Sequence, residues 1–376
     1  MTKPLRTHPW SESVERVIFH CTDYLSFAGK PLPGGRQRHL GDLASAVRDR
    51  WKRDVLIVQK GTHDFETTCP EGFRVRGLRC DTTSRGDPKL GLLTRRLAGP
   101  ADGVVYAGGE DAWPFFAPRG KGIQHGIWWD GPLALQARLV QRRRALGFVR
   151  SMQSVLCVDT NFINWVRGQG ADGLDLCNKC VYVPNYADTA RIPAPDLDRP
   201  PHDPVRILFA RRYERKRGTE LFIEMLSVLL RLGLVFHADL LTIGGVEPIR
   251  ARVRAMGLEH VVSVAEESMD GILARYAHAD IAVVPTLWSE GTSLAAVEAI
   301  CAGVPVVATP VGGLGNVIIP HVNGYLVPPE PRALADAVRG AIRPETWRRL
   351  RSNCLAMRPA LSLDRWRSDV LTWIAG

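Results

Sequence analysis

Two glutamates lie eight positions apart in the stretch SEGTSLAAVEAICAGVPVVATPVGG, and their setting suggests ligand chemistry. Glu290 lies in a loop that follows a predicted strand, and Glu298 lies on an almost wholly apolar helix. Thr292 or Ser293 is the predicted N-cap of this helix, and Gly303 is predicted to end it. The pattern therefore places one carboxylate before the helix and one inside it.

The start of this helix is a candidate anion site. In an open α/β sheet, ligands bind beyond the carboxyl ends of the strands, and residues 287–293 form such a loop. The N–H groups of Thr292, Ser293 and Leu294, next to Gly291, lack acceptors within the helix and lie at its positive end. A phosphate or diphosphate is the ligand that such a helix start favours.

Glu298 has two interpretations. It lies about five residues into the helix, roughly 7.5 Å along its axis from the anion site, which suits a ribose hydroxyl pair attached to a diphosphate. The alternative is an ion pair with a cation from a neighbouring element, because an unpaired buried carboxylate is unfavourable. Glu290 either faces the ligand cleft or is a solvated loop carboxylate.

Composition limits the class of protein. The chain has 376 residues, of which 45% are hydrophobic and 23% charged, and this is typical of a soluble protein with two domains. Its net charge of +10 favours an anionic partner, such as nucleic acid, an acidic membrane surface or a phosphorylated small molecule. Neither a signal peptide nor a membrane-spanning stretch is predicted, so we expect a cytoplasmic protein.

Apolar runs rich in Val and Ile alternate with helical periodicity, which predicts the α/β class with two doubly wound, Rossmann-like domains. Strands are predicted at 17–20, 54–59, 103–107, 122–125, 154–159 and 181–184, and again at 205–210, 238–243, 261–264, 280–285 and 304–308. We expect a first domain over 1–187, a proline-rich linker over 188–204 and a second domain over 205–358. An amphipathic C-terminal helix within 359–376 is expected to pack back on the first domain.

The E-x7-E stretch closely resembles the donor-site signature of GT-B fold glycosyltransferases, specifically the large retaining group called family 4, or glycosyl transferases group 1. The resemblance implies two Rossmann-like domains that face a cleft. It also implies that Glu298 holds the donor ribose and that Glu290 contacts hydroxyls of the transferred sugar.

A second segment, ILFARRYERKRGTELF, resembles the R-x4-K-G element with which this family clamps the donor diphosphate. Anchoring on Gly218 gives Arg212 and Arg217, and Arg211 and Lys216 are the one-residue alternatives. Two cations at a strand-to-helix loop can flank a diphosphate. A solvated basic loop is the other interpretation of this run.

Three further segments resemble the family. PGGRQRH is similar to its glycine-rich turn, which implies that Gly34 and Gly35 approach the donor phosphate. GIQHGIWW resembles its H-G segment, which implies that His125 borders the transferred sugar, although a buried structural histidine is the alternative. VPNYAD resembles the segment that closes the first domain, with Asn185 matching. The chain departs from the family's G-G-x-x-E element at Asn316.

The resemblance implies a retaining, hexosyltransferase-type reaction between a nucleotide-diphosphate sugar and a hydroxyl of a saccharide or lipid-linked saccharide acceptor, in cell-surface polysaccharide biosynthesis. No D-x-D run suits a metal, so no metal or other cofactor is expected, and the cations are expected to replace it. An anionic membrane surface is a further expected partner, which would place the protein at the inner face of the membrane, and no nucleic acid is expected. The alternatives are a nucleotide-sugar epimerase of the same fold and a noncatalytic protein that binds anions or nucleic acid.

Overall fold

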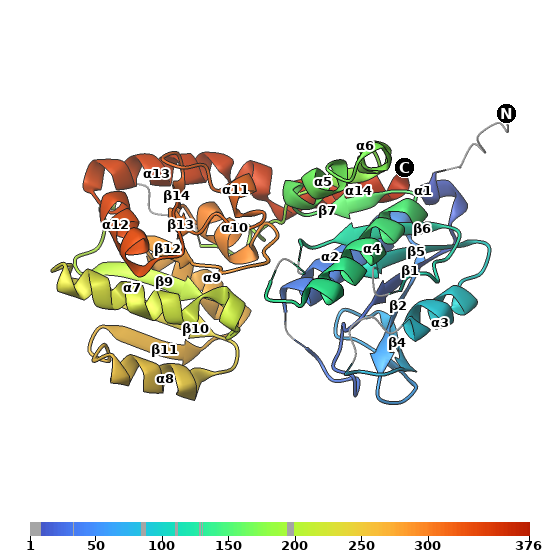
Figure 1. The fold of residues 1–376 in the computed structure, drawn as a ribbon, viewed down its shortest axis with the longest axis horizontal. Helices are drawn as coiled ribbons and strands as arrows, with labels where there is room; N and C mark the ends of the chain where they lie inside the picture. The colour runs from blue at the N-terminus through green and yellow to red at the C-terminus, as the bar shows by residue number, and fades with distance from the viewer. Residues whose placement is uncertain are drawn as a thin grey trace. The chain divides into compact units, whose positions relative to one another are not determined.

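The computed structural model describes residues 9–32, 34–83, 88–109, 112–127, 129, 131–193 and 199–376. The chain forms two compact units (Figure 1). Unit 1 comprises Met1–His125, Pro132–Val183 and Arg367–Gly376. Unit 2 comprises Gly126–Gly131 and Pro184–Trp366. The short segment Gly126–Gly131 lies within the stretch expected for the first domain, but it packs with unit 2.

Unit 1 is built on an eight-stranded sheet with the order β3-β4-β2-β1-β5-β6-β7-β8 among the described residues. Its pairs are parallel except for β3 and β4, which are antiparallel. The strands are β1 (Arg16–Cys21), β2 (Asp54–Gly61), β3 (Phe65–Thr68), β4 (Arg74–Arg79), β5 (Asp102–Ala107), β6 (Gly120–Gln124), β7 (Val155–Cys157) and β8 (Cys180–Tyr182). β1 and β2 are buried almost throughout, as expected for central parallel strands.

The helices of unit 1 are α1 (Trp10–Ser13), α2 (Gly35–Trp51), α3 (Lys89–Leu97), α4 (Leu135–Ser151), α5 (Thr160–Arg167) and α6 (Ala171–Cys177). The terminal helix α14 (Leu363–Ala375) contributes its last residues to this unit. Buried Lys121 on β6 donates to the carbonyl oxygens of Trp373 (2.8 Å) and Ile374 (3.1 Å). A cation at the carbonyl end of a helix is favourable, so Lys121 holds the end of α14 on the sheet.

Unit 2 contains a six-stranded parallel sheet with the order β11-β10-β9-β12-β13-β14 among the described residues. The strands are β9 (Val205–Ala210), β10 (Phe236–Thr242), β11 (Val262–Glu266), β12 (Ile281–Val284), β13 (Val306–Ala308) and β14 (Gly324–Leu326). Counted within the unit, this is the order 3-2-1-4-5-6 of doubly wound nucleotide-binding domains, and the strand order reverses between β9 and β12.

Two apolar layers cover the faces of the second sheet. One layer includes α7 (Thr219–Arg231), α8 (Val246–Ala255) and α12 (Pro331–Ala341), and α7 packs against α12 (Figure 1). The other includes α9 (Met269–His278), α10 (Leu294–Cys301) and α11 (Leu314–Val317). Helix α13 (Pro344–Met357) contributes to both, and the short 3-10 turns are η3 (Arg215–Arg217) and η4 (Pro359–Leu361). The predicted fold class, two parallel-sheet α/β domains, is confirmed.

The end of the expected linker is fixed to the second sheet. Asp280, which is fully buried before β12, accepts hydrogen bonds from the Arg199 guanidinium (2.6 Å), from the His202 ring (2.9 Å) and from the Arg206 backbone N–H (2.9 Å). A buried carboxylate needs such donors, and here they come from the incoming chain. Residues 199–206 are therefore part of the framework of unit 2.

Candidate functional site

The central feature of unit 2 lies where its strand order reverses. Arg211 directly follows β9, and Thr286 and Glu290 follow the neighbouring strand β12. Because the carboxyl ends of parallel strands meet at one edge of the sheet, these three side chains come together. Ligands of doubly wound domains bind at this point.

Glu290 is buried, with 9% of its surface exposed. Its Oε2 accepts hydrogen bonds from Arg211 Nη2, from Arg217 Nη1 (2.6 Å) and from Thr286 Oγ1 (3.0 Å). Burial favours a raised pKa for Glu290, but the charges and hydrogen bonds of the two arginines outweigh it and lower the pKa to about 2. Glu290 is therefore an ionised, buried carboxylate, and its interpretation as a solvated loop residue is wrong.

The two arginines differ in their remaining contacts. Arg211 is buried, and its Nη1 donates to Ser293 Oγ at 3.2 Å. Arg217 is more exposed and also lies 3.9 Å from a carboxylate oxygen of Glu214. Lys216 pairs with the same glutamate at 3.2 Å. The cluster therefore runs from a buried end at Arg211 to a solvated end at Glu214.

The structure places Arg211, rather than Arg212, beside Arg217. The side chain of Arg212 is 41% exposed and pairs with Glu214 at 3.9 Å, whereas the side chain of Arg211 is 5% exposed and pairs with Glu290. Successive residues at the end of a strand point to opposite sides, so a shift of one residue exchanges a buried side chain for an exposed one. The choice of Arg212 over its one-residue alternative is thus not supported by this geometry, while Arg217 and Lys216 both belong to the cluster.

Two glycines bring the loops of this site together. Gly218 has a φ of +77°, and a Cβ there would lie 1.9 Å from the carbonyl oxygen of Pro285. Gly312 has a φ of +55°, and a Cβ there would lie 1.9 Å from the carbonyl oxygen of Glu290. Gly313 N–H then donates to that same oxygen at 3.0 Å. Both positions require glycine, and the G-G pair fixes the backbone of Glu290.

Helix α10 begins at Leu294 after the N-cap Ser293, in agreement with the prediction, and Gly303 follows its end with a φ of +74°. The Ser293 side chain makes no capping hydrogen bond and instead accepts from Arg211. Thr292 Oγ1 accepts from the backbone N–H of Asn185 at 2.8 Å, and the Asn185 side-chain amide donates to the Thr292 carbonyl. Asn185 therefore positions the start of α10, next to the buried Gly291.

Glu298 is buried on α10, with 4% of its surface exposed. Its neighbour Cys301 has a pKa raised to about 12, chiefly by burial and in smaller part by the charge of Glu298. The burial agrees with both interpretations of this residue, a ribose ligand or a structural ion pair. Its binding role stays a prediction.

Unit 1 brings together a different set of predicted residues. His125 follows β6, and its Nε2 lies 3.4 Å from Nδ1 of His39 on α2, with the two rings edge to face. Burial, and then the charge of Arg36, lower the pKa of His125 to about 3, so its ring is neutral at physiological pH. No sequence motif pointed to His39, because it lies within a helix, and the resemblance to the family's glycine-rich turn rests on Gly34 and Gly35.

The glycine-rich turn lies at the start of the same helix. Gly34 is the N-cap of α2 and Gly35 its first residue, and no side chain caps this end. The backbone of Gly34 is extended, with a φ of 176°, which any residue adopts. The turn therefore places an uncapped helix start on the element that carries Arg36 and His39, but the conformation of Gly34 does not itself demand glycine.

A second buried histidine lies near the strand-order reversal of unit 1, between β1 and β5. Nδ1 of His20, on β1, lies 2.9 Å from Thr94 Oγ1 on α3. Burial, and then the charge of Lys60, lower the pKa of His20 to about 3. No motif pointed to this residue, since it lies inside an apolar strand.

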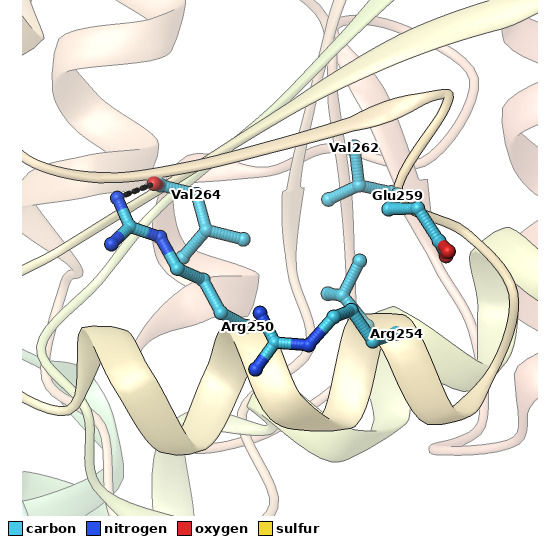
Figure 2. A pocket seen from close by; sticks show the side chains of 6 residues that line it. Arg250, Arg254, Glu259, Val262 and Val264 are labelled. Carbon is cyan, nitrogen blue, oxygen red and sulfur yellow. Dashed lines mark hydrogen bonds between the residues drawn. The ribbon is translucent and has the colours of Figure 1, made fainter.

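A hollow of about 210 Å³ lies between α8 and the edge strand β11, away from the predicted site residues (Figure 2). Arg250, Arg254 and Glu259 form its polar wall, and Arg250 donates to the Val264 carbonyl oxygen at 3.1 Å. Within the described ranges, no three His, Cys, Asp or Glu side chains are grouped to hold a metal ion. None of the described helices has the length and apolar character needed to span a membrane.

Most of the second unit is similar to a known family. Residues 204–343 match the family model described as glycosyl transferases group 1. The chain is 33% identical over 188 residues to a D-inositol 3-phosphate glycosyltransferase of Xylanimonas cellulosilytica, covering 48% of this chain and 43% of that protein. It is 29% identical over 177 residues to a phosphatidyl-myo-inositol mannosyltransferase of Mycobacterium leprae, covering 46% and 47%. The matched segment thus spans less than half of the length of either relative.

Solved structures extend the likeness to both units. Sucrose-phosphate synthase of Thermosynechococcus elongatus superposes with a TM-score of 0.73 over 95% of this chain and 98% of its own, at 18% identity. HepE of Anabaena, in complex with UDP and glucose, superposes with a TM-score of 0.71 over the same shares, at 17% identity. The protein thus has the two-domain GT-B fold, and its residues 204–343 are similar to the glycosyl transferases group 1 family.

Proposed function

We propose that the protein is a glycosyltransferase that moves a sugar from a nucleotide-diphosphate sugar to a hydroxyl of a saccharide or lipid-linked saccharide, with retention of configuration. The observation that carries this proposal is the cluster of Arg211, Arg217 and Glu290 at the start of α10. It combines cations, a helix start and an ionised carboxylate at the point where doubly wound domains bind ligands.

The charge of the cluster suits a diphosphate. Four cations (Arg211, Arg212, Lys216 and Arg217) are linked through two carboxylates (Glu214 and Glu290), so four minus two leaves a net charge of +2. Arginine forks bind phosphate oxygens in pairs, and the start of α10 adds backbone donors. In this proposal these groups neutralise the charge that develops on a leaving diphosphate and take the part that a metal ion would otherwise play.

The carboxylates take the roles that the family resemblance implies. Glu290 contacts hydroxyls of the transferred sugar, and Glu298 holds the donor ribose from one and a half turns inside α10. Retention requires the acceptor hydroxyl to attack the sugar from the same face that the diphosphate leaves. The leaving phosphate then takes up the proton of that hydroxyl. His125, which is neutral, borders the sugar as a hydrogen-bonding group and carries no charge into the reaction.

A thermal-shift screen of nucleotide sugars tests the proposal. A true donor raises the unfolding temperature by mass action, by an amount set by its concentration relative to its dissociation constant. Arg217→Met is the matched control, because it removes one cation at the partly solvated end of the cluster. The proposal fails if no nucleotide sugar stabilises the protein, or if the variant responds as the wild type does.

An activity assay then separates transfer from epimerisation. The hit from the screen is incubated with and without a mixture of saccharide and lipid-linked acceptors. Transfer predicts a glycosylated product and a free nucleoside diphosphate only when the acceptor is present. Conversion of the nucleotide sugar to its epimer without acceptor would instead identify an epimerase.

We also propose that the outer face of α4 contacts an anionic membrane from the cytoplasmic side. Leu135, Leu139 and Val140 are at least half exposed on this helix. The helix carries five arginines and no acidic residue. Exposed apolar side chains flanked by cations are typical of helices that lie in the membrane interface.

Vesicle sedimentation tests this contact. The protein is expected to sediment with vesicles that contain anionic lipid and to be released as salt rises, because the attraction is screened. Leu139→Ser is expected to weaken binding, whereas Leu230→Ser, an exposed leucine on α7 in unit 2, serves as its control. Equal binding to neutral and anionic vesicles would refute the proposed contact.

A further inference from the structure

The hydrogen bonds to the Glu290 carboxylate converge on one of its two oxygens. Among the described residues, three donors, from Arg211, Arg217 and Thr286, bind the same oxygen, Oε2. The two guanidinium groups that would receive a donor phosphate therefore converge on one carboxylate oxygen. A carboxylate oxygen and a phosphate oxygen are similar acceptors for arginine, and both carry negative charge.

A phosphate that binds Arg211 meets two acceptors that are already in place. Arg211 is 8% exposed, its Nη2 is occupied by Glu290, and its Nη1 donates to Ser293. A guanidinium has five N–H groups, so others remain, but a ligand that takes either of these two donors competes with the acceptor already there. Glu290 is the one that carries negative charge, so its repulsion by a diphosphate adds to the competition.

The backbone of Glu290 is held by neighbouring residues, whereas its side chain can rotate to other partners. Gly313 N–H donates to the Glu290 carbonyl oxygen at 3.0 Å, and Gly312 packs against that carbonyl. The preceding residue, Ser289, has a φ of +57°, which is uncommon for a residue other than glycine. A change of partner therefore falls on the side-chain torsions of Glu290.

We infer that Glu290 is an internal stand-in for the donor diphosphate: its carboxylate occupies Arg211 and Arg217 until a diphosphate takes them, and it is then released to the transferred sugar. This inference rests on the proposed function, because that function assigns the diphosphate. The release couples two events, since the carboxylate reaches the sugar only when the phosphates are seated. A ligand that binds the released state more tightly shifts the population toward it.

The inference predicts that removing the stand-in strengthens phosphate binding. Inorganic pyrophosphate and the diphosphates UDP, GDP and ADP are titrated into the wild type and into Glu290→Gln by calorimetry. The variant is expected to bind pyrophosphate and the best nucleoside diphosphate about tenfold more tightly, because the competing charge is gone. If Glu290 instead serves to position the two arginines for the ligand, the same variant binds more weakly, which would overturn the inference.

Two further variants separate the stand-in from a general gain in positive charge. Thr286→Val removes one donor to Oε2 without changing any charge, and it is expected to tighten binding about two- to fivefold. Glu214→Gln removes a carboxylate from the solvated end of the cluster, and its gain is expected to be smaller than that of Glu290→Gln because that site is screened. An equal gain for Glu214→Gln, or no gain for Thr286→Val, contradicts the inference.

The outcomes also distinguish this inference from the proposed function. If neither the wild type nor Glu290→Gln binds any nucleoside diphosphate, the proposed function fails. If the wild type binds a nucleoside diphosphate and the variants bind it no more tightly, the proposed function is retained, and the inference that Glu290 substitutes for the diphosphate is rejected. Thermal unfolding checks that each variant is folded. If Glu290→Gln does not fold, the affinity of Thr286→Val for the diphosphate tests the inference by itself.

Discussion

The buried polar groups of the two sheets differ in their chemistry. In unit 2 the residues that follow β9 and β12 are charged, buried and paired, with Glu290 between two arginines. In unit 1 the buried groups on β1 and after β6 are His20 and His125, and burial keeps both neutral. Two largely parallel sheets thus hold a buried ionic cluster in one unit and neutral, hydrogen-bonding groups in the other.

The difference follows from how each unit offsets desolvation. A buried charge persists only when an opposite charge or several hydrogen bonds stabilise it, and unit 2 supplies both. A buried histidine without a carboxylate partner loses its proton instead. The proposed diphosphate site therefore lies among paired charges in unit 2, and the histidines of unit 1 offer only neutral hydrogen-bonding groups.

The largest expected effect is on the turnover number, and it differs between a variant of unit 2 and a variant of unit 1. Glu290→Gln is expected to lower the turnover number for sugar transfer at least about a hundredfold, because it removes the ionised group assigned to the sugar. His125→Gln, which keeps a neutral hydrogen-bonding side chain, is expected to lose only about tenfold. Steady-state kinetics with the donor from the thermal-shift screen measure both, and an equal loss would remove the distinction between the sites.

A smaller effect is expected within the cationic cluster. Arg211→Met is expected to weaken nucleoside-diphosphate binding about ten- to a hundredfold, because this guanidinium is buried at the reversal point. Arg212→Met is expected to change binding less than about threefold, because its side chain is exposed. Calorimetry measures the affinity of both variants for the nucleoside diphosphate. A larger loss of affinity in Arg212→Met than in Arg211→Met would show that Arg212 is the residue that binds the diphosphate.

Acid is expected to destabilise unit 1 before unit 2. The pKa values of His20 and His125 fall from an ordinary 6.5 to about 3 on folding, so the unfolded chain binds more protons between these values. Their contribution to stability is complete above pH 6.5 and declines as the pH falls, by about 1.4 kcal/mol per pH unit for each histidine. Glu290, with its pKa lowered from 4.5 to about 2, adds a loss only below about pH 4.5.

Hydrogen exchange measured separately for peptides of the two units tests this order. Between pH 6.5 and 5, peptides of unit 1 are expected to lose protection first, and His20→Gln is expected to reduce the pH dependence. Simultaneous loss in both units, or loss in unit 2 first, would contradict the contrast.

The smallest effect concerns two glycines that open helices in the two units. Gly218→Ala is expected to destabilise the protein by about 1–3 kcal/mol, because its φ is positive and the Pro285 carbonyl leaves no space for a Cβ. Gly34→Ala is expected to change stability by less than about 0.5 kcal/mol, since that backbone is extended. Denaturant unfolding measures the free energy of unfolding of both variants. A large loss of stability in Gly34→Ala would show that a neighbouring atom lies too close to position 34 for a Cβ, which its φ does not reveal.

The fold and the core of the unit 2 site could be predicted because their signals are local. Alternating apolar strands and helical periodicity predicted both sheets, and the α10 start and Glu290 come from one continuous motif. Strands β3, β4 and β14 were not predicted: β3 lies at a sheet edge with alternating burial, β4 alternates arginine with apolar residues, and β14 has only three residues. Such short, half-polar segments resemble loops in sequence.

The finer features of the sites depend on long-range packing. Arg211 and Arg212 differ only in which side of the chain they occupy after β9, and a run of basic residues contains no information about that register. The ion pair that holds Glu290 joins residues 79 positions apart. The pairing of His39 with His125 likewise depends on how α2 and β6 meet, so a sequence pattern cannot reveal it.

A structure of the protein with a bound nucleoside diphosphate tests the central claim most directly. We predict that the diphosphate lies within hydrogen-bonding distance of Arg211, Arg217 and the backbone N–H groups at the start of α10, with the Glu290 carboxylate no longer on the two arginines. A diphosphate bound elsewhere would contradict the proposed site. A diphosphate bound at the α10 start, with Glu290 still on both arginines, would contradict its role as a stand-in.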